Sequence, residues 1–219
     1  MSTSDVQRDL ILLVADHQIE AAIQGLLSRP RSLAIRPLNA VIRTHPENDP
    51  GCYLRAHDLL RASRIRYAHG IVIFDREGCG NEAEPREALE AEVEERLARN
   101  GWGDRARVIV IDPELESWVW SDSPQVDRVL GWTGRMPTLR TWLTETGFLK
   151  EAETKPGRPK EVMQAALRLV RKPRSSAVYR ELADNVSFRR CVDPAFKKLT
   201  TTLQTWFPPE EHSSREDSP

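Results

Sequence analysis

The chain has 219 residues, of which 39% are hydrophobic and 30% are charged, with a formal net charge of −1. This length allows one large domain, or one domain with an appendage, and a core that needs neither disulfides nor a structural metal. No apolar run approaches the roughly 20 residues that span a bilayer, and the N-terminal MSTSDVQRDL lacks the pattern of a signal peptide, so we expect no membrane association.

The first 121 residues alternate expected strands and helices. The expected strands are Asp9–Val14, Arg31–Ile42, Gly70–Phe74 and Val108–Ile111, and the expected helices are His17–Ser28, Tyr53–Arg64 and Glu82–Arg99. The stretch RTHPENDPG, residues 43–51, has the composition of a loop. Strands that alternate with helices predict an α/β fold: a Rossmann-like, parallel sheet of about four strands flanked by helices.

The pattern changes after Ser121, where short helical stretches alternate with proline and glycine. We therefore expect an α/β domain over residues 1–121 and a helical C-terminal part over residues 122–207 that packs on it. The final segment, residues 208–219 (PPEEHSSREDSP), is polar and predicts a disordered tail.

Charge is unevenly distributed along the chain. Residues 75–127 contain 15 acidic residues against 6 arginines, whereas residues 150–198 contain 13 Lys and Arg against 6 acidic residues. One part would concentrate cations and the other would meet phosphates; two solvated surfaces that merely differ in charge explain the counts equally well. The three cysteines, Cys52, Cys79 and Cys191, are far apart in the sequence, which predicts a reducing, cytoplasmic location.

Carboxylates follow three of the expected strands. Asp16 comes after the first strand, Asp75 and Glu77 after the third, and Glu114 and Glu116 after the fourth. In a parallel sheet the carboxyl ends of the strands meet at one edge, where ligands bind. Carboxylate oxygens suit Mg²⁺ or Mn²⁺, so the pattern predicts a metal site. The alternative is that these acids are strand ends and helix starts that meet water.

The basic C-terminal part offers residues that could position a nucleic-acid backbone. These residues are Lys155, Arg158, Lys160, Arg189 and Arg190. The run KPGRPK over residues 155–160 fits either a phosphate-binding loop or an exposed linker. The chain also has six tryptophans, for which core packing is favoured over base stacking.

The order of these motifs resembles the Toprim fold, the metal-binding domain of topoisomerases, primases and OLD-type nucleases. The chain is more closely similar to a family of small bacterial Toprim-like proteins. The similarity rests on VIFDRE at residues 72–77, PELESW at residues 113–118 and the Ser187-Phe188 pair. The resemblance implies a bacterial anti-phage defence component, of the kind found in methylation-associated systems.

The resemblance also implies roles for individual residues. Asp75 and Glu77 match the acid-x-acid metal ligands, although the second position is usually aspartate, and Glu114 or Glu116 would complete the shell around Mg²⁺ or Mn²⁺. The first Toprim acid is a glutamate followed by glycine that acts as general acid/base. Here Ala15-Asp16 stands in its place, with Glu20 as a second candidate for the catalytic role.

Two functions remain open from the sequence. The first is a metal-dependent nuclease that hydrolyses phosphodiester bonds in DNA or RNA. The second is a catalytically inactive subunit that binds partner subunits of a defence complex or nucleic acid, with a homo-oligomer as a further option. A receiver-like or nucleotide-binding domain is disfavoured, because no glycine-rich phosphate loop of standard spacing is present.

Overall fold

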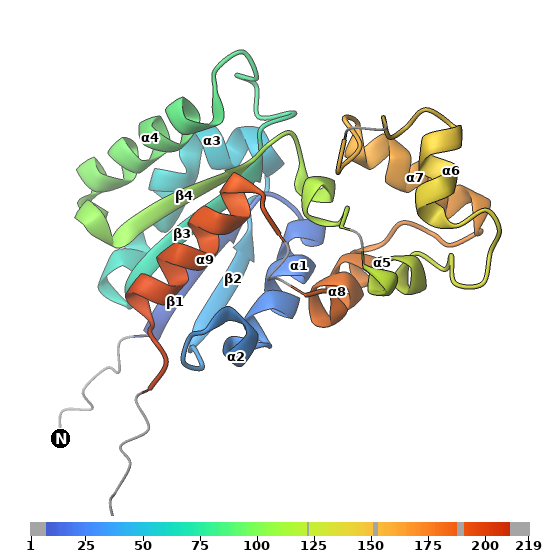
Figure 1. The fold of residues 1–219 in the computed structure, drawn as a ribbon. Helices are drawn as coiled ribbons and strands as arrows, with labels where there is room; N and C mark the ends of the chain where they lie inside the picture. Colours follow the sequence, from blue (N-terminus) through green and yellow to red (C-terminus); the bar gives the residue numbers. More distant parts are fainter. Residues whose placement is uncertain (1–7, 122, 151–152, 188–190, 211–219) are drawn as a thin grey trace, which may run out of the picture.

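The protein is an α/β structure built on four parallel strands (Figure 1). The computed structural model describes residues 8–121, 123–150, 153–187 and 191–210. The sheet has the order β2-β1-β3-β4 and consists of β1 (Arg8–Val14), β2 (Ala40–Thr44), β3 (Tyr67–Asp75) and β4 (Ala106–Ile111). The α/β prediction, with a parallel sheet of about four strands flanked by helices, is confirmed.

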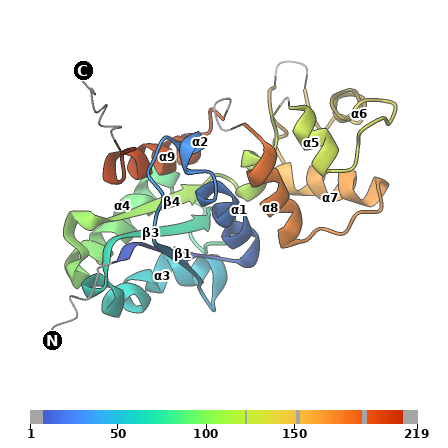
Figure 2. The ribbon, with the colours of Figure 1, turned by 90° about the horizontal axis from the view of Figure 1, so that it is seen from below.

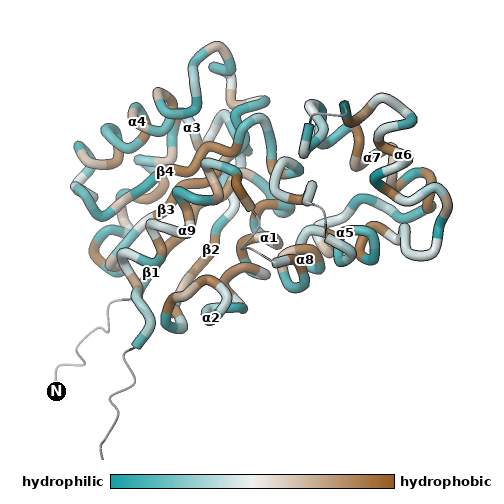
Figure 3. The backbone as a smooth tube through the Cα atoms, viewed as in Figure 1, coloured by the Kyte–Doolittle hydropathy of each residue, from teal (hydrophilic) through white to brown (hydrophobic). Residues whose placement is uncertain are grey.

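Strands β1 and β3 are apolar through residues 10–14 and 71–74, because both faces of the sheet are covered there. Residues 10–15 and 71–74 have no exposed surface. Helices α3 (Asn48–Leu60) and α4 (Arg86–Leu97) cover one face of the sheet. Helices α1 (His17–Leu27), α2 (Pro30–Leu33) and α9 (Pro194–Trp206) lie on the other (Figures 1 and 2). Figure 3 shows the brown, hydrophobic sheet between helices whose outer sides are teal.

A second group of helices lies beyond the carboxyl ends of the strands (Figure 2). It contains α5 (Pro124–Val129), α6 (Leu139–Glu145), α7 (Pro159–Leu169) and α8 (Ser176–Asn185). Helix α8 packs closely on α1, and Gly25 makes this possible, since a Cβ there would lie 2.6 Å from the Cβ of Ala183. The helices expected after residue 122 thus lie in two places, because α9 returns to the sheet.

Short 3₁₀ and π turns connect the main elements. They are η1 (Arg61–Ile65), η2 (Ala98–Trp102), η3 (Gly103–Arg105) and η4 (Leu115–Trp118). Residues 211–219 of the expected tail lie outside the described residues. No helix in the described ranges combines the length and apolarity needed to cross a bilayer.

Two segments differ from the sequence expectation. The strand expected over Arg31–Ile42 is a short helix, α2, followed by an extended segment and a shorter strand, β2. The loop expected over residues 43–51 contains the end of β2 and, from Asn48, the first turn of α3. Proline in a first helical turn removes no hydrogen bond, because the first N–H groups of a helix have no partner within it. A composition typical of loops therefore also fits a helix start.

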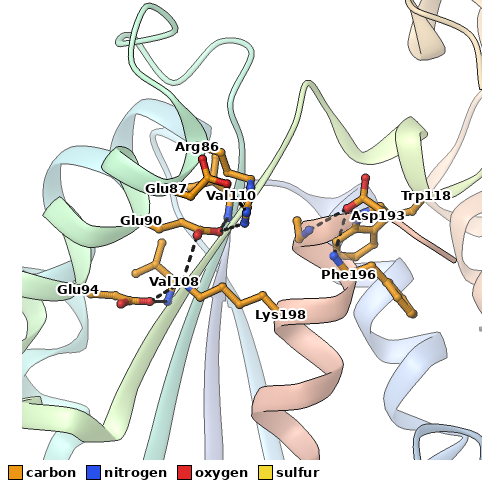
Figure 4. A network of polar contacts seen from close by, with 11 residues as sticks. Arg86, Glu87, Glu90, Glu94, Val108, Val110, Trp118, Asp193, Phe196 and Lys198 are labelled. Atoms are coloured by element: carbon orange, nitrogen blue, oxygen red, sulfur yellow. Dashed lines mark hydrogen bonds and ion pairs between the residues drawn. The ribbon is translucent and has the colours of Figure 1, made fainter.

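The outer edge of β4 is closed by side chains rather than by another strand (Figure 4). Glu94 Oε1 accepts a hydrogen bond from the Val108 N–H at 2.9 Å, and Glu90 Oε1 accepts one from the Val110 N–H at 3.0 Å. Lys198 Nζ of α9 bonds both carboxylates, at 2.8 and 3.1 Å. The spacing of Glu90 and Glu94 along α4 matches the spacing of the Val110 and Val108 N–H groups along β4, because four helical residues rise about 6 Å and two strand residues about 6.6 Å. We call these groups the β4 clasp.

Candidate metal centre at the carboxyl ends of the strands

The strand order places a topological switch point between β1 and β3. The chain leaves β1 through α1 to β2 on one side, whereas β3 and β4 lie on the other. Ligands of open parallel α/β sheets bind outside the carboxyl ends of the strands at such a point. Asp16 follows β1 and Asp75 ends β3, so these two predicted residues flank the position where the fold favours a ligand.

Asp75 is a buried acid of the site with an unpaired side-chain oxygen. Its residue exposure is 9%, and its Oδ1 atom is buried without a hydrogen-bond partner. Burial raises the pKa of Asp75 well above its usual value, and the nearby charges of Asp49, Glu116 and Asp16 raise it further, against a smaller lowering by the Leu115 N–H. A buried carboxylate with an unpaired oxygen and acidic neighbours is costly unless a cation is present.

Asp49 is an acid of the site that the sequence reasoning missed. It lies in the first turn of α3, and its Oδ1 accepts a hydrogen bond from the Asp75 backbone N–H at 2.8 Å. Burial raises the pKa of Asp49, and the charge of Asp16 adds to this effect. A Cβ at Gly51 would lie 2.0 Å from the His45 ring. This close packing of the ring on Gly51 fixes the start of α3, and with it Asp49.

Asp16 enters the site from the start of α1. Its Oδ1 caps the helix by accepting hydrogen bonds from the N–H groups of Gln18 and Ile19, both at 2.8 Å. The residue is half-buried. The cap fixes the carboxylate, as expected for aspartate at a helix N-terminus, and its charge contributes to the raised pKa values of both Asp49 and Asp75.

Glu116 approaches Asp75 from η4 and is 1% exposed. Its Oε1 accepts hydrogen bonds from the Tyr179 hydroxyl at 2.5 Å and from Arg174 Nη2 at 2.7 Å. Burial raises the pKa of Tyr179, and the Glu116 charge raises it further, so the phenol stays protonated. The helical group therefore contributes an arginine and a tyrosine to the site, neither of which the sequence reasoning identified.

The carboxylates share one arrangement. In Asp16, Asp49 and Glu116, one oxygen accepts hydrogen bonds from protein donors, and these bonds fix the side chain. Such hydrogen bonds are how proteins orient metal-ligating carboxylates. In Asp75, Oδ1 is the unpaired atom. The donors are all oxygen atoms, which is the chemistry that Mg²⁺ and Mn²⁺ favour.

The coordination itself is not preformed. Across the part of the chain that the structure describes, no three Asp, Glu, His or Cys side chains form a group that could hold a metal ion as they stand. Mg²⁺ is commonly held by one or two carboxylates, with waters and substrate phosphates in the remaining positions. The residues present therefore suit a site with few protein ligands, centred on Asp75.

Glu114 faces a lysine instead of the other carboxylates. Its Oε1 accepts a hydrogen bond from the Lys160 N–H at 2.9 Å, and its Oε2 lies 3.1 Å from Lys160 Nζ. Burial raises the pKa of Glu114, although Lys160 opposes this. Burial would lower the pKa of Lys160, but Glu114 outweighs it and raises it, with smaller contributions from Glu116 and Asp75. Glu114 thus positions α7, and its lysine, beside the site.

Two of the predicted site residues lie apart from this cluster. Glu77 is exposed in the turn after β3. Glu20 lies one turn into α1, where its Oε2 is 2.9 Å from His17 Nδ1. Neither charge is among those with the largest effects on the pKa of Asp75. The acid-x-acid spacing does not bring both acids together, because β3 ends at Asp75 and a turn follows.

The predicted nucleic-acid contacts are dispersed. Lys155 Nζ donates to the Ser117 carbonyl at 2.6 Å, beside the site, whereas Arg158 is exposed and pairs with Glu161 at 3.0 Å. Arg189 and Arg190 lie outside the described residues. Trp118 and Trp120 use their N–H groups to bond Asp193 and the Pro159 carbonyl, which supports core packing for these two tryptophans.

Comparison with known proteins finds no matching family model, no similar curated protein and no similar solved structure.

Proposed function

We propose that the chain is a Mg²⁺- or Mn²⁺-dependent phosphodiesterase that hydrolyses nucleic acid. The observation that carries the proposal is the buried, unpaired Oδ1 of Asp75 beside Asp49, Asp16 and Glu116 at the topological switch point. Structural carboxylates are normally paired when buried. An unpaired one in a set of strand-end acids is typical of a functional site.

Asp75 and Asp49 would hold the cation, and Asp16 or Glu116 would complete its protein ligands. A divalent cation bound there would polarise a phosphate oxygen and activate a water for in-line attack. Asp16 is fixed by its helix cap, and its other carboxylate oxygen would accept the proton of the attacking water. Lys160 and Arg174, which pair with Glu114 and Glu116, would position the phosphate.

The Toprim-like resemblance of the sequence motifs supports a biological setting. We place the reaction in bacterial anti-phage defence, including methylation-associated systems, where the chain would act with other subunits. DNA and RNA both fit the proposed chemistry, because the site residues would contact phosphate rather than base.

Metal binding is tested by calorimetric titration of Mn²⁺ and Mg²⁺ into three proteins: wild type, Asp75→Asn and Glu77→Gln. We expect saturable binding in the wild type and in the Glu77→Gln control, which removes an exposed acid, and no binding in Asp75→Asn. Cleavage of labelled DNA and RNA should follow the same order. Wild-type cleavage that persists unchanged in Asp75→Asn would contradict the proposal.

A second candidate is a non-catalytic Toprim-like subunit. The hydrogen bonds of Arg174 and Tyr179 to Glu116 favour it, because they neutralise an acid that an active metal site would use. The replacement of the Glu-Gly pair by Ala15-Asp16 favours it too. In this case the wild type would not cleave DNA or RNA in Mn²⁺, and it would co-purify with the products of neighbouring genes.

A further inference from the structure

The two edges of the sheet are treated differently. The edge of β4 is closed by the β4 clasp, whose carboxylates occupy the outward N–H groups of Val108 and Val110. Strand β2 forms the opposite edge. An open edge presents unpaired N–H and C=O groups that template pairing with another strand, and proteins usually block it. Within the described residues, side-chain hydrogen bonds block the β4 edge and none blocks the β2 edge.

The hydrogen bonds of β2 show which residues face outward. The His45 N–H donates to the Val14 carbonyl, and the Asn39 carbonyl accepts from the Asp9 N–H. Backbone groups alternate sides along a strand, so residues 39, 41, 43 and 45 face β1. The N–H and C=O groups of Ala40, Ile42 and Thr44 therefore point away from the sheet. No hydrogen bond joins them to any other residue of the described ranges.

We propose that a second copy of the chain pairs with this edge, β2 against β2, antiparallel and with the two-fold axis at Ile42. In this register Ile42 meets Ile42 of the partner subunit, and Ala40 meets Thr44 of the partner subunit. All three outward residues then form pairs that exchange both backbone hydrogen bonds. The two sheets join into one, with an isologous interface.

The sequence of the strand suits pairing with itself. The strand reads AVIRT, so this register places Val41 opposite Arg43 of the partner subunit, and no like charges stand directly opposite, where they would destabilise the pair. The net charge of −1 adds little repulsion between copies. Val41 and Ile42 are half-buried hydrophobic residues packed against the core, and pairing would cover more of their surface.

The interface also fixes where the two candidate metal centres lie. Thr44 ends β2, and the chain continues through His45 to Asp49. Because the paired strands run in opposite directions, the two centres lie at opposite ends of the joined sheet. Pairing through β2 leaves each centre complete within its own copy, so the inference does not depend on the proposed activity.

The first test is a cross-link at the two-fold axis. Residues of a hydrogen-bonded antiparallel pair have Cα atoms about 5.5 Å apart, within the roughly 4.4–6.8 Å range of a disulfide. Under mild oxidation, Ile42→Cys should form a covalent dimer. The matched control is Ala40→Cys, whose two copies would lie about 14 Å apart along the paired strands and should stay uncrosslinked. Equal cross-linking of both variants, or of neither, would overturn the proposed register.

The second test measures mass in solution by sedimentation. The wild type should exceed the 25.0 kDa of one chain, with a concentration-dependent dimer. Ala40→Glu with Thr44→Glu places like charges opposite each other twice and should give monomers. Ala40→Lys with Thr44→Glu places opposite charges there and should keep the dimer. Circular dichroism checks that both variants fold. A monomeric wild type, or a dimer that survives in the first variant, would overturn the proposal.

Discussion

The molecule contains two groups of buried carboxylates that are treated in opposite ways. In the β4 clasp, Glu90 is 4% exposed, and it accepts hydrogen bonds from the Val110 N–H, Arg86 and Lys198. At the carboxyl ends of the strands, Asp75 is 9% exposed, has an unpaired oxygen, and the charges that act most strongly on its pKa are other acids. Glu90 and Asp75 are buried to a similar depth, but only Glu90 has positively charged hydrogen-bond partners among the described residues.

The difference separates a structural role from a functional one. Buried acids that are fully paired stabilise local geometry. Removing one leaves its partners buried without a hydrogen-bond acceptor or an opposite charge. Buried acids that repel one another raise the free energy of the folded state and are retained where a ligand needs them. Substitutions in the two groups should therefore change stability in opposite directions.

The largest effect is expected in the clasp. Glu90→Ala leaves the Val110 N–H, Arg86 and Lys198 without this partner, and we expect the free energy of unfolding to fall by about 3–5 kcal/mol. Urea unfolding measures the change. The matched control is Glu87→Ala on the same helix, where the side chain is 70% exposed and the loss should be much smaller. Equal losses of stability in Glu90→Ala and Glu87→Ala would show that the clasp has no special structural role.

The opposite sign is expected at Asp75. Asp75→Asn removes a buried charge and should raise the free energy of unfolding at pH 7, without metal, by about 1–2 kcal/mol. Burial and acidic neighbours raise the folded-state pKa, so the loss of stability begins as the pH rises above the unfolded-state value and is complete above the folded-state pKa. Below the ordinary value of 3.8, wild type and variant should unfold alike. A variant less stable than wild type at pH 7 would show that the acid is structural.

The smallest effect is expected where an acid is paired near the surface. Arg36 bonds both oxygens of Asp9 and lowers its pKa, against a smaller opposing effect of burial. A lowered folded-state pKa gives stability that is present above pH 3.8 and is lost as the pH falls through the folded-state value.

Asp9→Asn should therefore cost up to about 1 kcal/mol at pH 7 and nothing in strong acid, where both proteins carry a neutral side chain. Asp58→Asn, at a side chain that is 67% exposed, should cost less than Asp9→Asn at pH 7. Unfolding curves across pH values compare the three proteins. A loss that does not depend on pH would assign the effect of Asp9 to packing.

The sheet could be predicted from local patterns because its strands are apolar runs bounded by polar residues. The first, third and fourth expected strands lie within β1, β3 and β4. The second did not match, because alternation in Arg31–Ile42 extends through a short helix and an extended segment. That alternation comes from side chains buried in the core, such as Leu33 and Ile35, and does not reflect strand pairing.

The site could be predicted only in part. Asp16, Asp75 and Glu116 lie together, because strand ends converge in any parallel sheet. Asp49 was missed since its segment has loop composition, and a proline one residue after an acid could have indicated a helix start. Arg174 and Tyr179 reach the site across 58 and 63 residues of sequence. No local pattern encodes such contacts.

The position of α9 at the end of the chain means that the β4 clasp is completed late in synthesis. Lys198, the cation that holds Glu90 and Glu94 together, follows the end of β4 by more than 80 residues. At 5–20 residues per second, synthesis of that segment takes about 4–16 s. Glu90 and Glu94 are therefore synthesised several seconds before the lysine that pairs with them, and the clasp is complete only when α9 has packed on the sheet.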